Sequence, residues 1–264
     1  MKPVRVVVQG ASGKMGQEVI RTLCGEPEMQ LVGAVDLKVS GDCLALPDGS
    51  GTVPFSSNLD HILTSCRPEV LVDFSIAQAT MPAVRIATKQ GVNLVIGTTG
   101  LTADDLNEID RLARGGKVGA VAAPNFALGA VLMMHLAKVA ARYLDYAEII
   151  ELHHLQKADA PSGTALSTAK AMAAARGKPF LQASAPKEAL DSRGKQVEGV
   201  AIHSVRLPGL LAHQEVIMGG PGQTLSIRHD TSGRECYMPG VMLAIREVVK
   251  HKGLIYGLDT LLGL

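Results

Sequence analysis

The sequence predicts an α/β protein whose parallel sheet is followed by a smaller α+β region. Three observations support this prediction. Short apolar runs alternate with helix-like segments through the first half of the 264 residues. A glycine-rich turn follows the first run, and after about residue 124 several strand-like runs come in succession, separated by turns that contain Pro and Gly. Continuous apolar strands that alternate with helices are typical of a parallel sheet covered on both faces.

The first half contains five expected strands and three expected helices. The strands are Val4–Gln9, Leu31–Asp36, Val70–Phe74, Val92–Ile96 and Val118–Ala122. The helices are Lys14–Cys24, Ala77–Gln90 and Ala103–Arg114. In the first helix, the apolar residues Met15, Val19, Ile20 and Leu23 are spaced to share one face.

The second half predicts a different arrangement. We expect helices at Leu128–Tyr143, Gly163–Ala175 and Met238–Val249, and strands at Glu148–His154, Val197–Arg206, Ala212–Met218 and Gln223–His229. The later strands follow one another with only turns between them, which favours antiparallel or mixed pairing. The turn-rich stretch Gly177–Gly194 is the segment expected to be mobile.

Composition excludes several classes of function. The 26 basic and 25 acidic residues nearly balance, and the 3% of aromatic residues include no Trp, which argues against a nucleic-acid surface. Four cysteines form no CxxC pair, so we expect free thiols and no metal site. No apolar run reaches the roughly 18 residues of a membrane span, and we expect a cytoplasmic protein.

A glycine-rich turn, residues 10–16, lies between the first strand and the first helix. Gly10 permits a tight turn, Gly13 lets phosphates approach the backbone, and Gly16 lets the helix pack closely on the strand. The helix start adds free N–H groups and a positive dipole end. Although the spacing is GxxGxxG, its context predicts a Rossmann-like dinucleotide-binding domain. The residues expected to contact the cofactor here are Gly10, Ala11, Ser12, Gly13, Lys14 and Met15.

An acidic residue follows at the end of the second expected strand. Asp36 lies 20 residues after Gly16, where a carboxylate accepts hydrogen bonds from the adenosine ribose hydroxyls. Asp36 would repel the 2′-phosphate of NADPH, but Lys14 and Lys38 can pair with that phosphate. We therefore expect either NADH or NADPH to serve as cofactor.

Two later loops also end expected parallel strands, where ligands of such sheets bind. One contains Gly97, Thr98 and Thr99, and is suited to a close approach to the nicotinamide ring. The other offers backbone groups for the carboxamide, from Ala123, Pro124, Asn125 and Phe126.

The richest polar segment, residues 151–165, reads ELHHLQKADAPSGTA. His153 and Lys157 are candidate proton donors, since an imidazole donates a proton near neutral pH. The helix that starts at Gly163 and Thr164 offers N–H groups to a carboxylate. Adjacent strand residues point to opposite faces, so His154 need not share the role of His153.

These motifs resemble the 4-hydroxy-tetrahydrodipicolinate reductase family, also called dihydrodipicolinate reductases. The resemblance runs through VVVQGASGKMGQ at 6–17, VDFS at 72–75, GTTG at 97–100, APNFALG at 123–129 and the segment 151–165. It implies an oxidoreductase of lysine and diaminopimelate biosynthesis. In that reaction the hydroxylated cyclic dicarboxylate loses water, and NADH or NADPH delivers hydride to ring carbon 4.

The resemblance also implies roles for individual residues in the second half. His153 matches the family's proton donor or acceptor, and Lys157 matches its second proton donor. His154 matches a substrate-binding histidine, while Gly163 and Thr164 match the clamp on a substrate carboxylate.

The domain organisation and assembly are likewise implied by the resemblance. It gives a dinucleotide-binding domain at 1–126, a substrate-binding and oligomerisation domain at 127–237, and a return to the first domain at 238–264. Arg234 and Tyr237 fall where the family has an Arg-x-x-aromatic pattern near the cofactor. The family further implies a homotetramer and a small dicarboxylate as the partner molecule.

Two alternative functions stay open on the residues alone. Another NAD(P)-dependent amino-acid dehydrogenase would share the glycine turn and stays possible on that turn alone. A semialdehyde dehydrogenase would need a cysteine nucleophile near the nicotinamide, and no cysteine lies in the loops at 97–100 or 123–129. A non-catalytic regulator that binds NAD(H) would share it too, but it would not need proton donors such as His153 and Lys157.

Overall fold

The structure is a computed structural model that describes residues 2–39, 41–182 and 192–264. Within it the chain forms two compact units. The first unit combines Met1–Leu128 with Arg234–Leu264, and the second is Gly129–Gly233. Half of the segment that we expected to be mobile, residues 183–191 of 177–194, lies outside the described residues.

The first unit is built on an eight-stranded sheet in the order β13-β7-β6-β5-β1-β2-β4-β3. All neighbouring strands are parallel except β3, which is antiparallel to β4. The strands are β1 (Val4–Gln9), β2 (Met29–Val35), β3 (Cys43–Ala45), β4 (Thr52–Ser56), β5 (Val70–Asp73), β6 (Asn93–Ile96), β7 (Gly119–Ala122) and β13 (Gly253–Tyr256). The predicted parallel sheet is therefore confirmed.

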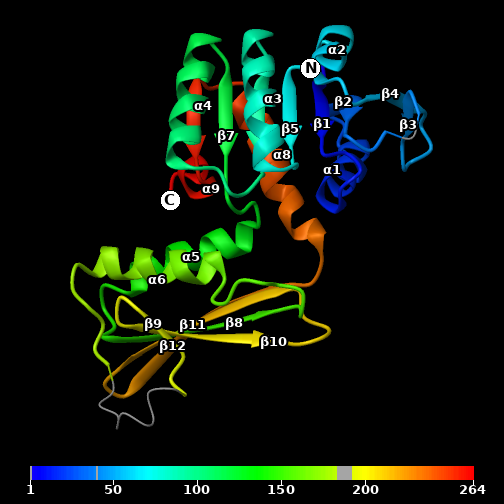
Figure 1. The fold of residues 1–264 in the computed structure, drawn as a ribbon. Helices are drawn as coiled ribbons and strands as arrows, with labels where there is room; N and C mark the ends of the chain where they lie inside the picture. The colour runs from blue at the N-terminus through cyan, green and yellow to red at the C-terminus, as the bar shows by residue number, and fades with distance from the viewer. Residues whose placement is uncertain (1, 40, 183–191) are drawn as a thin grey trace. The chain divides into compact units, whose positions relative to one another are not determined.

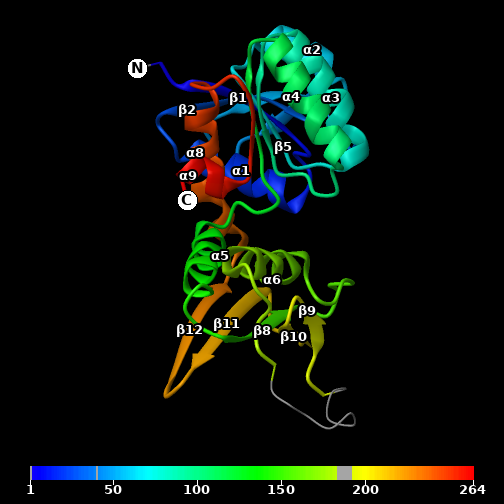
Figure 2. The same ribbon diagram turned by 90° about the vertical axis from the view of Figure 1, so that its left-hand side faces the viewer.

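Helices cover both faces of this sheet, as Figure 2 shows: α2, α3 and α4 on one face, α1 and α8 on the other. Their bounds are α1 (Lys14–Cys24), α2 (Leu59–Cys66), α3 (Ala77–Lys89), α4 (Ala103–Gly115), α8 (Met238–Val248) and the short α9 (Leu258–Leu262). Strand residues such as Val7, Leu71 and Leu94 are fully buried in the core beneath α2, α3 and α4. Burial on both faces explains why these strands are continuous apolar runs.

The second unit is a five-stranded mixed sheet with helices on one face (Figure 1). Strand β8 pairs in parallel with β10 and antiparallel with β11, which confirms the expected mixed pairing. The strands, in the order β12-β11-β8-β10-β9, are β8 (Tyr146–His153), β9 (Lys195–Val197), β10 (Val200–Arg206), β11 (Ala212–Gly220) and β12 (Gln223–Thr231). Helices α5 (Leu128–Ala140) and α6 (Gly163–Arg176) bury Met133 and Met172 against Ile149 and Val216.

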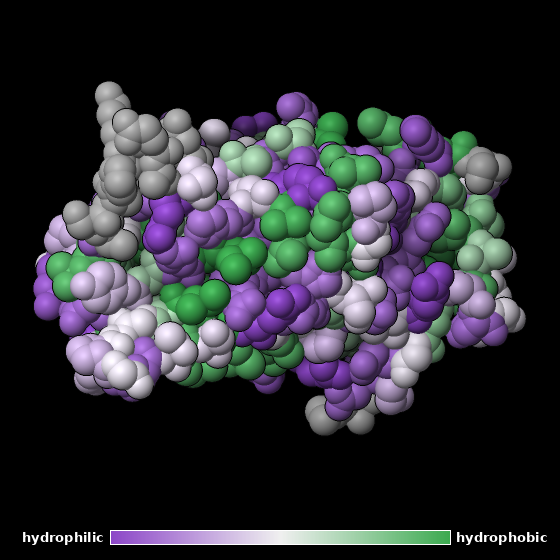
Figure 3. Space-filling view, turned by 90° about the horizontal axis from the view of Figure 1, so that it is seen from below, coloured by the Kyte–Doolittle hydropathy of each residue, from purple (hydrophilic) through white to green (hydrophobic). Residues whose placement is uncertain are grey.

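Among the described residues of this unit, no helix lies on the other face of the sheet. Figure 3 looks onto this side, where hydrophobic residues lie between hydrophilic ones. The strand register places Ile150, Leu152, Val205 and Ile217 on this face, and all four are partly exposed. We call this surface the open face.

The structure differs from the expectation at several places. One expected strand, Val197–Arg206, is the hairpin β9–β10, because Glu198 and Gly199 have φ values of 51° and 83° and form a two-residue turn. Strand β8 ends at His153, so His154 lies beyond it. The sequence analysis missed β3, β4, α2, β13 and α9, which are short. No helix in the described part of the chain has the length and apolarity of a membrane span.

Candidate active site

The glycine turn after β1 owes its shape to missing side chains. Gly10 has a φ of +79°, and a Cβ atom there would lie 2.5 Å from the carbonyl oxygen of Phe74. A Cβ atom on Gly16 would lie 2.1 Å from the carbonyl oxygen of Gly10. Both approaches are too close for any side chain, so glycine is required at both positions. The turn thus brings the start of α1 tightly against the carboxyl end of β1.

The start of α1 is free to bind an anion. Gly13 is the N-cap residue and supplies no side-chain hydrogen bond to the first turn. Asp36 follows β2, and its carboxylate accepts hydrogen bonds from the backbone N–H of Ser12 at 2.9 Å and of Lys38 at 3.0 Å. These bonds fix the carboxylate beside the glycine turn, and each oxygen retains a lone pair for a further donor. Lys14, the first residue of α1, and Lys38, two residues after Asp36, are both exposed.

A groove of about 710 Å³ runs along this edge of the sheet. Its size is in the range of small-molecule sites. The glycine turn and Asp36 form one side of it, and the start of α2 and one face of α3 contribute the other. Free N–H groups, a carboxylate acceptor and a mostly apolar wall fit a dinucleotide. The sequence analysis missed the wall, formed by Ser57, Asn58, Leu59, Asp60, Ala79, Pro82, Ala83 and Ile86, because no glycine or charge pattern marks it.

A buried carboxylate organises the loop after β5. Asp73 is 1% exposed and accepts hydrogen bonds from Ser75 Oγ at 2.5 Å and Thr80 Oγ1 at 2.6 Å. Burial raises the pKa of Asp73, and the hydrogen bonds from Ser75 and Thr80 act in the opposite direction. Ser75 N–H also donates to Thr98 Oγ1 at 3.1 Å, which connects this loop to the one after β6. The motif VDFS thus has a structural role that the sequence analysis did not assign.

The other expected cofactor residues follow β6 and β7 or lie near the C-terminus. A Cβ atom on Gly97 would lie 2.0 Å from the ring of Phe74, so the packing of that ring alone explains this glycine. Thr98 is buried, Thr99 is exposed, and Phe126 packs on Phe74 with ring centroids 5.8 Å apart.

The last expected cofactor residues lie in the loop after β7 and in a short helix before α8, and they differ in exposure. Ala123 is buried and Pro124 is exposed, while Asn125 accepts a hydrogen bond from the N–H of Ala127 at 2.9 Å. Arg234 and Tyr237 form the 3-10 helix η1 (Arg234–Tyr237), which packs against α1. Burial raises the pKa of Tyr237.

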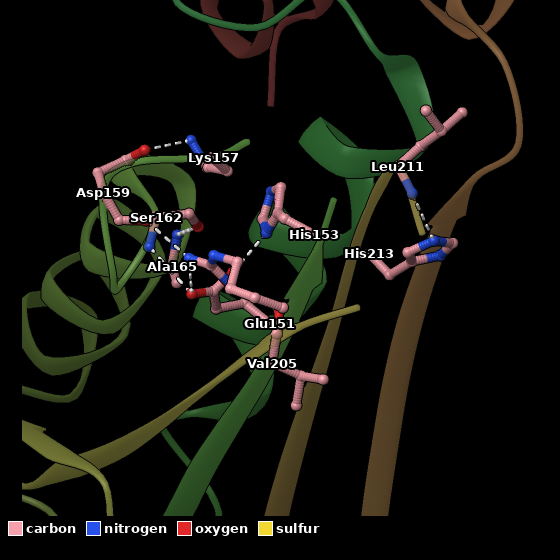
Figure 4. Close-up of polar contacts among 10 residues, drawn as sticks. Glu151, His153, Lys157, Asp159, Ser162, Ala165, Val205, Leu211 and His213 are labelled. Atoms are coloured by element: carbon pink, nitrogen blue, oxygen red, sulfur yellow. Dashed lines mark hydrogen bonds and ion pairs between the residues drawn. The ribbon is translucent and has the colours of Figure 1, made fainter. Parts of the chain in front are cut away.

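In the second unit, the end of β8 carries an imidazole bonded to a buried carboxylate (Figure 4). Glu151 is fully buried, and its Oε2 lies 2.5 Å from Nδ1 of His153. The two residues are two positions apart on one strand, so they share a face. Arg206 comes from the neighbouring strand β10, where it pairs in register with His153. Its guanidinium donates to both oxygens of Glu151, at 2.8 and 3.0 Å.

These contacts decide the charge of Glu151. Burial alone would raise its pKa, but hydrogen bonds from His153 and Arg206 outweigh burial and lower the pKa to about 2. The carboxylate is therefore ionised near neutral pH and can only accept hydrogen bonds. It follows that Nδ1 of His153 carries the proton of that bond, which leaves Nε2 as the nitrogen that can meet a substrate.

Lys157 lies in the loop that connects β8 with α6. Its Nζ is 2.6 Å from Asp159 Oδ1, as Figure 4 shows. The Lys157 ammonium, followed by smaller effects that include the N–H of Gly163, holds the pKa of Asp159 below its usual value. A carboxylate of the protein itself thus lies between the lysine and the start of α6. This is the place where we expected a carboxylate of the substrate.

The start of α6 is held by polar contacts from beneath and is open on its outer side. Ser162 caps the helix by accepting from the N–H of Ala165 at 3.2 Å. A Cβ atom on Gly163 would meet nothing within 4 Å, so a ligand has room there. The buried Gln214 donates to Thr168 Oγ1 at 2.9 Å, and Thr168 donates to the carbonyl oxygen of Thr164 at 2.8 Å. This chain fixes the first turn of α6 against the sheet.

The structure thus brings His153, Lys157, Gly163 and Thr164 into the same unit, around the start of α6. His154 follows β8, and its Nδ1 is buried without a hydrogen-bond partner. The sequence analysis missed Glu151 and Arg206 as functional residues. The spacing of Glu151 and His153 could have indicated the first, whereas Arg206 requires knowledge of the β8–β10 pairing. The described residues contain no group of three or more His, Cys, Asp or Glu that could hold a metal ion.

Fold and site together define a Rossmann-type oxidoreductase with a second, smaller sheet. An amine dehydrogenase from Mycobacterium smegmatis shares this fold, with a TM-score of 0.66 at 17% identity over 97% of this chain and 95% of that one. That likeness shows the fold alone. The chain itself belongs to the dihydrodipicolinate reductase family: residues 4–126 match the family's N-terminal part and residues 129–262 its C-terminal part. The resemblance seen in the sequence is thereby confirmed.

Individual relatives agree with this assignment over the full length. A 4-hydroxy-tetrahydrodipicolinate reductase from Dehalococcoides mccartyi is 58% identical over 100% of both chains. One from Moorella thermoacetica is 50% identical over 98% of both. The structure of a dipicolinate-bound dihydrodipicolinate reductase from Paenisporosarcina sp. TG-14 matches with a TM-score of 0.87 at 42% identity, covering 97% of this chain and 98% of that one. The N-terminal part of this family is a dinucleotide-binding domain, which agrees with the groove beside Asp36.

Proposed function

We propose that this protein reduces 4-hydroxy-tetrahydrodipicolinate to tetrahydrodipicolinate with NADH or NADPH, in the biosynthesis of lysine and diaminopimelate. The observation that carries the proposal is the cluster at the end of β8. An imidazole held by an ionised carboxylate stands in one unit with a lysine and an open helix start. Such a cluster supplies a proton and an anion site together, which reduction of an unsaturated dicarboxylate requires.

The first unit would hold the dinucleotide in its groove. Its pyrophosphate would bind the N–H groups at the start of α1, from Gly10 to Met15, and its ribose hydroxyls would donate to Asp36. Lys14 and Lys38 would pair with the 2′-phosphate of NADPH. The nicotinamide end would lie at the loops after β6 and β7, which hold the candidate residues Gly97, Thr98, Thr99, Ala123, Pro124, Asn125 and Phe126, and near Arg234 and Tyr237. When bound, this cofactor supplies the hydride.

The start of α6 would bind a carboxylate of the substrate. Gly163 leaves room for it, Thr164 adds a hydroxyl, and the helix end provides N–H groups and a positive dipole. His154 would bind the same substrate. The relative from Paenisporosarcina sp. TG-14 was solved with dipicolinate, a molecule of the same dicarboxylate class. Asp159 lies beside Lys157 and Gly163 and must move when a substrate carboxylate takes its place.

His153 would donate the proton that completes the reduction. Hydride addition to a conjugated imine leaves an electron-rich enamine, which needs an acid. Nδ1 of His153 is bonded to Glu151, so the proton that is transferred would be the second proton, which the ring carries on Nε2 when it is protonated. Lys157 would supply a second proton or stabilise negative charge on the substrate. If the protein were another amino-acid dehydrogenase, the presence of a proton donor such as His153 beside the anion site at the start of α6 would have no explanation.

We further propose that the protein works in the cytoplasm as a homotetramer. The open face supports the assembly, because Ile150, Leu152, Val205 and Ile217 lie there and no helix covers them. Partner sheets from other copies would bury these side chains. Light scattering on the purified protein measures the mass, and Ile217→Asp is expected to lower it; a monomeric wild type would contradict the assembly.

Activity is tested by following NADH and NADPH oxidation with the freshly formed cyclic dicarboxylate as substrate. His153→Ala and Lys157→Ala are each expected to lower kcat by about 10²–10⁴-fold. The affinity for the dinucleotide is expected to stay nearly unchanged, since it binds the other unit. Exposed Lys170→Ala on α6 is the control and should keep wild-type kcat. Oxidation that does not depend on the dicarboxylate, or wild-type kcat in His153→Ala, would contradict the proposal.

A further inference from the structure

A single carboxylate in the second unit connects three separate elements. Glu151 Oε2 accepts from His153 at the end of β8, and both oxygens accept from Arg206 on β10. Glu151 Oε1 also faces the backbone N–H of Ser162 at 3.3 Å, directly before α6. Figure 4 shows His153 and Ser162 approaching Glu151 from two sides. The proton donor and the anion-binding helix start therefore share one anchor.

Arg206 extends the connection to the loop that bears Lys157. Besides Glu151, its guanidinium donates to the backbone carbonyl of Asp159 at 2.7 Å and to that of Val205 at 2.8 Å. The carbonyl of Asp159 lies in the loop between Lys157 and Ser162. Arg206 thus holds this loop from beneath, while the Asp159 side chain reaches Lys157 above it.

We propose that Glu151 and Arg206 are a positioning pair for the reaction: Glu151 keeps the His153 proton on Nδ1 and Nε2 toward the substrate, and Arg206 keeps Glu151 and the Lys157 loop in place. This inference rests on the proposed function. Neither residue needs to touch the substrate, since each acts through His153, Ser162 or the loop.

Electrostatics explains why the pair needs both members. A buried carboxylate without partners becomes neutral, and a protonated Glu could itself donate to His153 and reverse the direction of that bond. The two bonds from Arg206 keep Glu151 ionised. The ionised carboxylate then stabilises the positive charge of a protonated His153, as an aspartate does for the histidine of serine proteases. Arg206 limits that stabilisation, because its own positive charge faces the same carboxylate.

The other groups around the pair are few. Gln214, which lies opposite Glu151 on β11, is neutral, and α6 presents the neutral Thr164 and Thr168. Burial lowers the pKa of His229 on β12, which keeps that ring neutral. Among the described residues, Arg206 from β10 is bonded to Glu151, and Lys157 is paired with Asp159 in the loop. His154 follows His153 in the chain, and His229 on β12 pairs with Gln214.

The pH dependence of kcat tests the pair. In Glu151→Gln the negative charge that favours protonated His153 is gone, so the alkaline fall of kcat is expected at a lower pH than in the wild type. The kcat itself is expected to drop by about 10²-fold, with KM for NADH unchanged. Glu151→Asp, which retains the charge, should restore the wild-type pH profile in part, and Arg206→Lys should lower kcat while raising KM for the dicarboxylate.

Glu108→Gln is the matched control. Glu108 on α4 accepts from Nε and Nη2 of Arg85 at 2.8 and 3.0 Å, as Glu151 accepts from Arg206, but it belongs to the first unit. Its variant should keep the wild-type kcat and pH profile. An equal loss of kcat at every pH in Glu151→Gln, with no shift of the profile, would overturn the proposal and leave a structural role only.

A measurement that needs no turnover separates the positioning role of Glu151 and Arg206 from the proposed reductase function. Nitrogen-15 NMR of His153 in the wild-type protein is expected to show the Nδ1–H tautomer of the neutral ring. If instead Nε2 carries the proton, the positioning pair is refuted, even where Glu151→Gln fails to fold. If the wild type shows the Nδ1–H tautomer but does not reduce the dicarboxylate, the proposed function fails and the assignment of the tautomer stands.

Discussion

We expect the choice between NADH and NADPH to depend on the charge of one half-buried residue, Asp36. We expect Asp36→Asn to shift the preference toward NADPH by about fivefold. The asparagine oxygen can still accept from the N–H of Ser12, which Asp36 binds at 2.9 Å, but the asparagine NH2 cannot accept from the N–H of Lys38. The substitution therefore removes the charge and keeps one of the two bonds, whereas Asp36→Ala would remove both.

The magnitude follows from where the charges lie. A charge pair near the surface is typically worth no more than about 1 kcal/mol, and that energy corresponds to about a fivefold ratio. Lys14 and Lys38 are exposed, so their attraction to a 2′-phosphate is screened to a similar size. Repulsion by Asp36 and attraction by the lysines then nearly cancel. The wild type should use the two cofactors within about one order of magnitude of each other.

The assay is kcat/KM for NADH and for NADPH at low and at high salt. Lys38→Gln is expected to shift the ratio toward NADH, and added salt should weaken NADPH use more than NADH use. Asp48→Asn is the matched control, because Asp48 also accepts from a backbone N–H two residues on, that of Ser50, yet lines a different cavity. An unchanged ratio in Asp36→Asn would show that Asp36 does not lie beside the ribose.

Three further outcomes are expected. Gly16→Ala should lower the free energy of unfolding by about 1–3 kcal/mol because its Cβ would lie 2.1 Å from the Gly10 carbonyl oxygen, whereas Gly115→Ala, with nothing within 4 Å, should change the urea midpoint little. Asp159→Asn should lower KM for the dicarboxylate by up to about fivefold, since it frees Lys157 from a competing carboxylate; a raised KM would contradict that competition. The pKa of Glu151 is lowered to about 2, so its stabilising contribution is complete above its unfolded pKa and is lost as the pH falls toward 2. The urea midpoint of the wild type should therefore drop toward that of Glu151→Gln between about pH 5 and pH 2, and a constant difference would show that Glu151 is not ionised.

The first unit could be predicted from sequence because its signals are local. Strands buried on both faces are continuous apolar runs, and β1 and α1 begin and end as expected. Gly10 and Gly16 are marked by backbone contacts within the same turn. The groove beside them was only half predictable, because its far wall comes from α2 and α3, whose residues carry no pattern that distinguishes a wall from a surface.

The second unit shows where local signals end. His153 and Lys157 stand out in the sequence as titratable residues beside a helix start, and the resemblance gave them roles. Arg206 lies 53 positions from His153 in the chain, and only the parallel pairing of β8 with β10 makes them neighbours. A parallel pair leaves no short turn between its strands to reveal it. The reactive residues of a site are therefore easier to predict from sequence than the residues that hold them in position.

The charges of this cluster suggest when His153 becomes a proton donor. With a neutral imidazole, Glu151 and Asp159 balance Arg206 and Lys157. A dianionic substrate that displaces Asp159 from Lys157 brings further negative charge close to His153, and negative charge favours the protonated ring. Binding should then take up a proton, so that the acid is charged only when its substrate is present. Calorimetry of dipicolinate binding in buffers of different ionisation enthalpy measures this uptake, which should be reduced in His153→Ala. Binding without proton uptake near neutral pH would mean that His153 is already protonated in the free protein. Protonation would then precede substrate binding instead of following it.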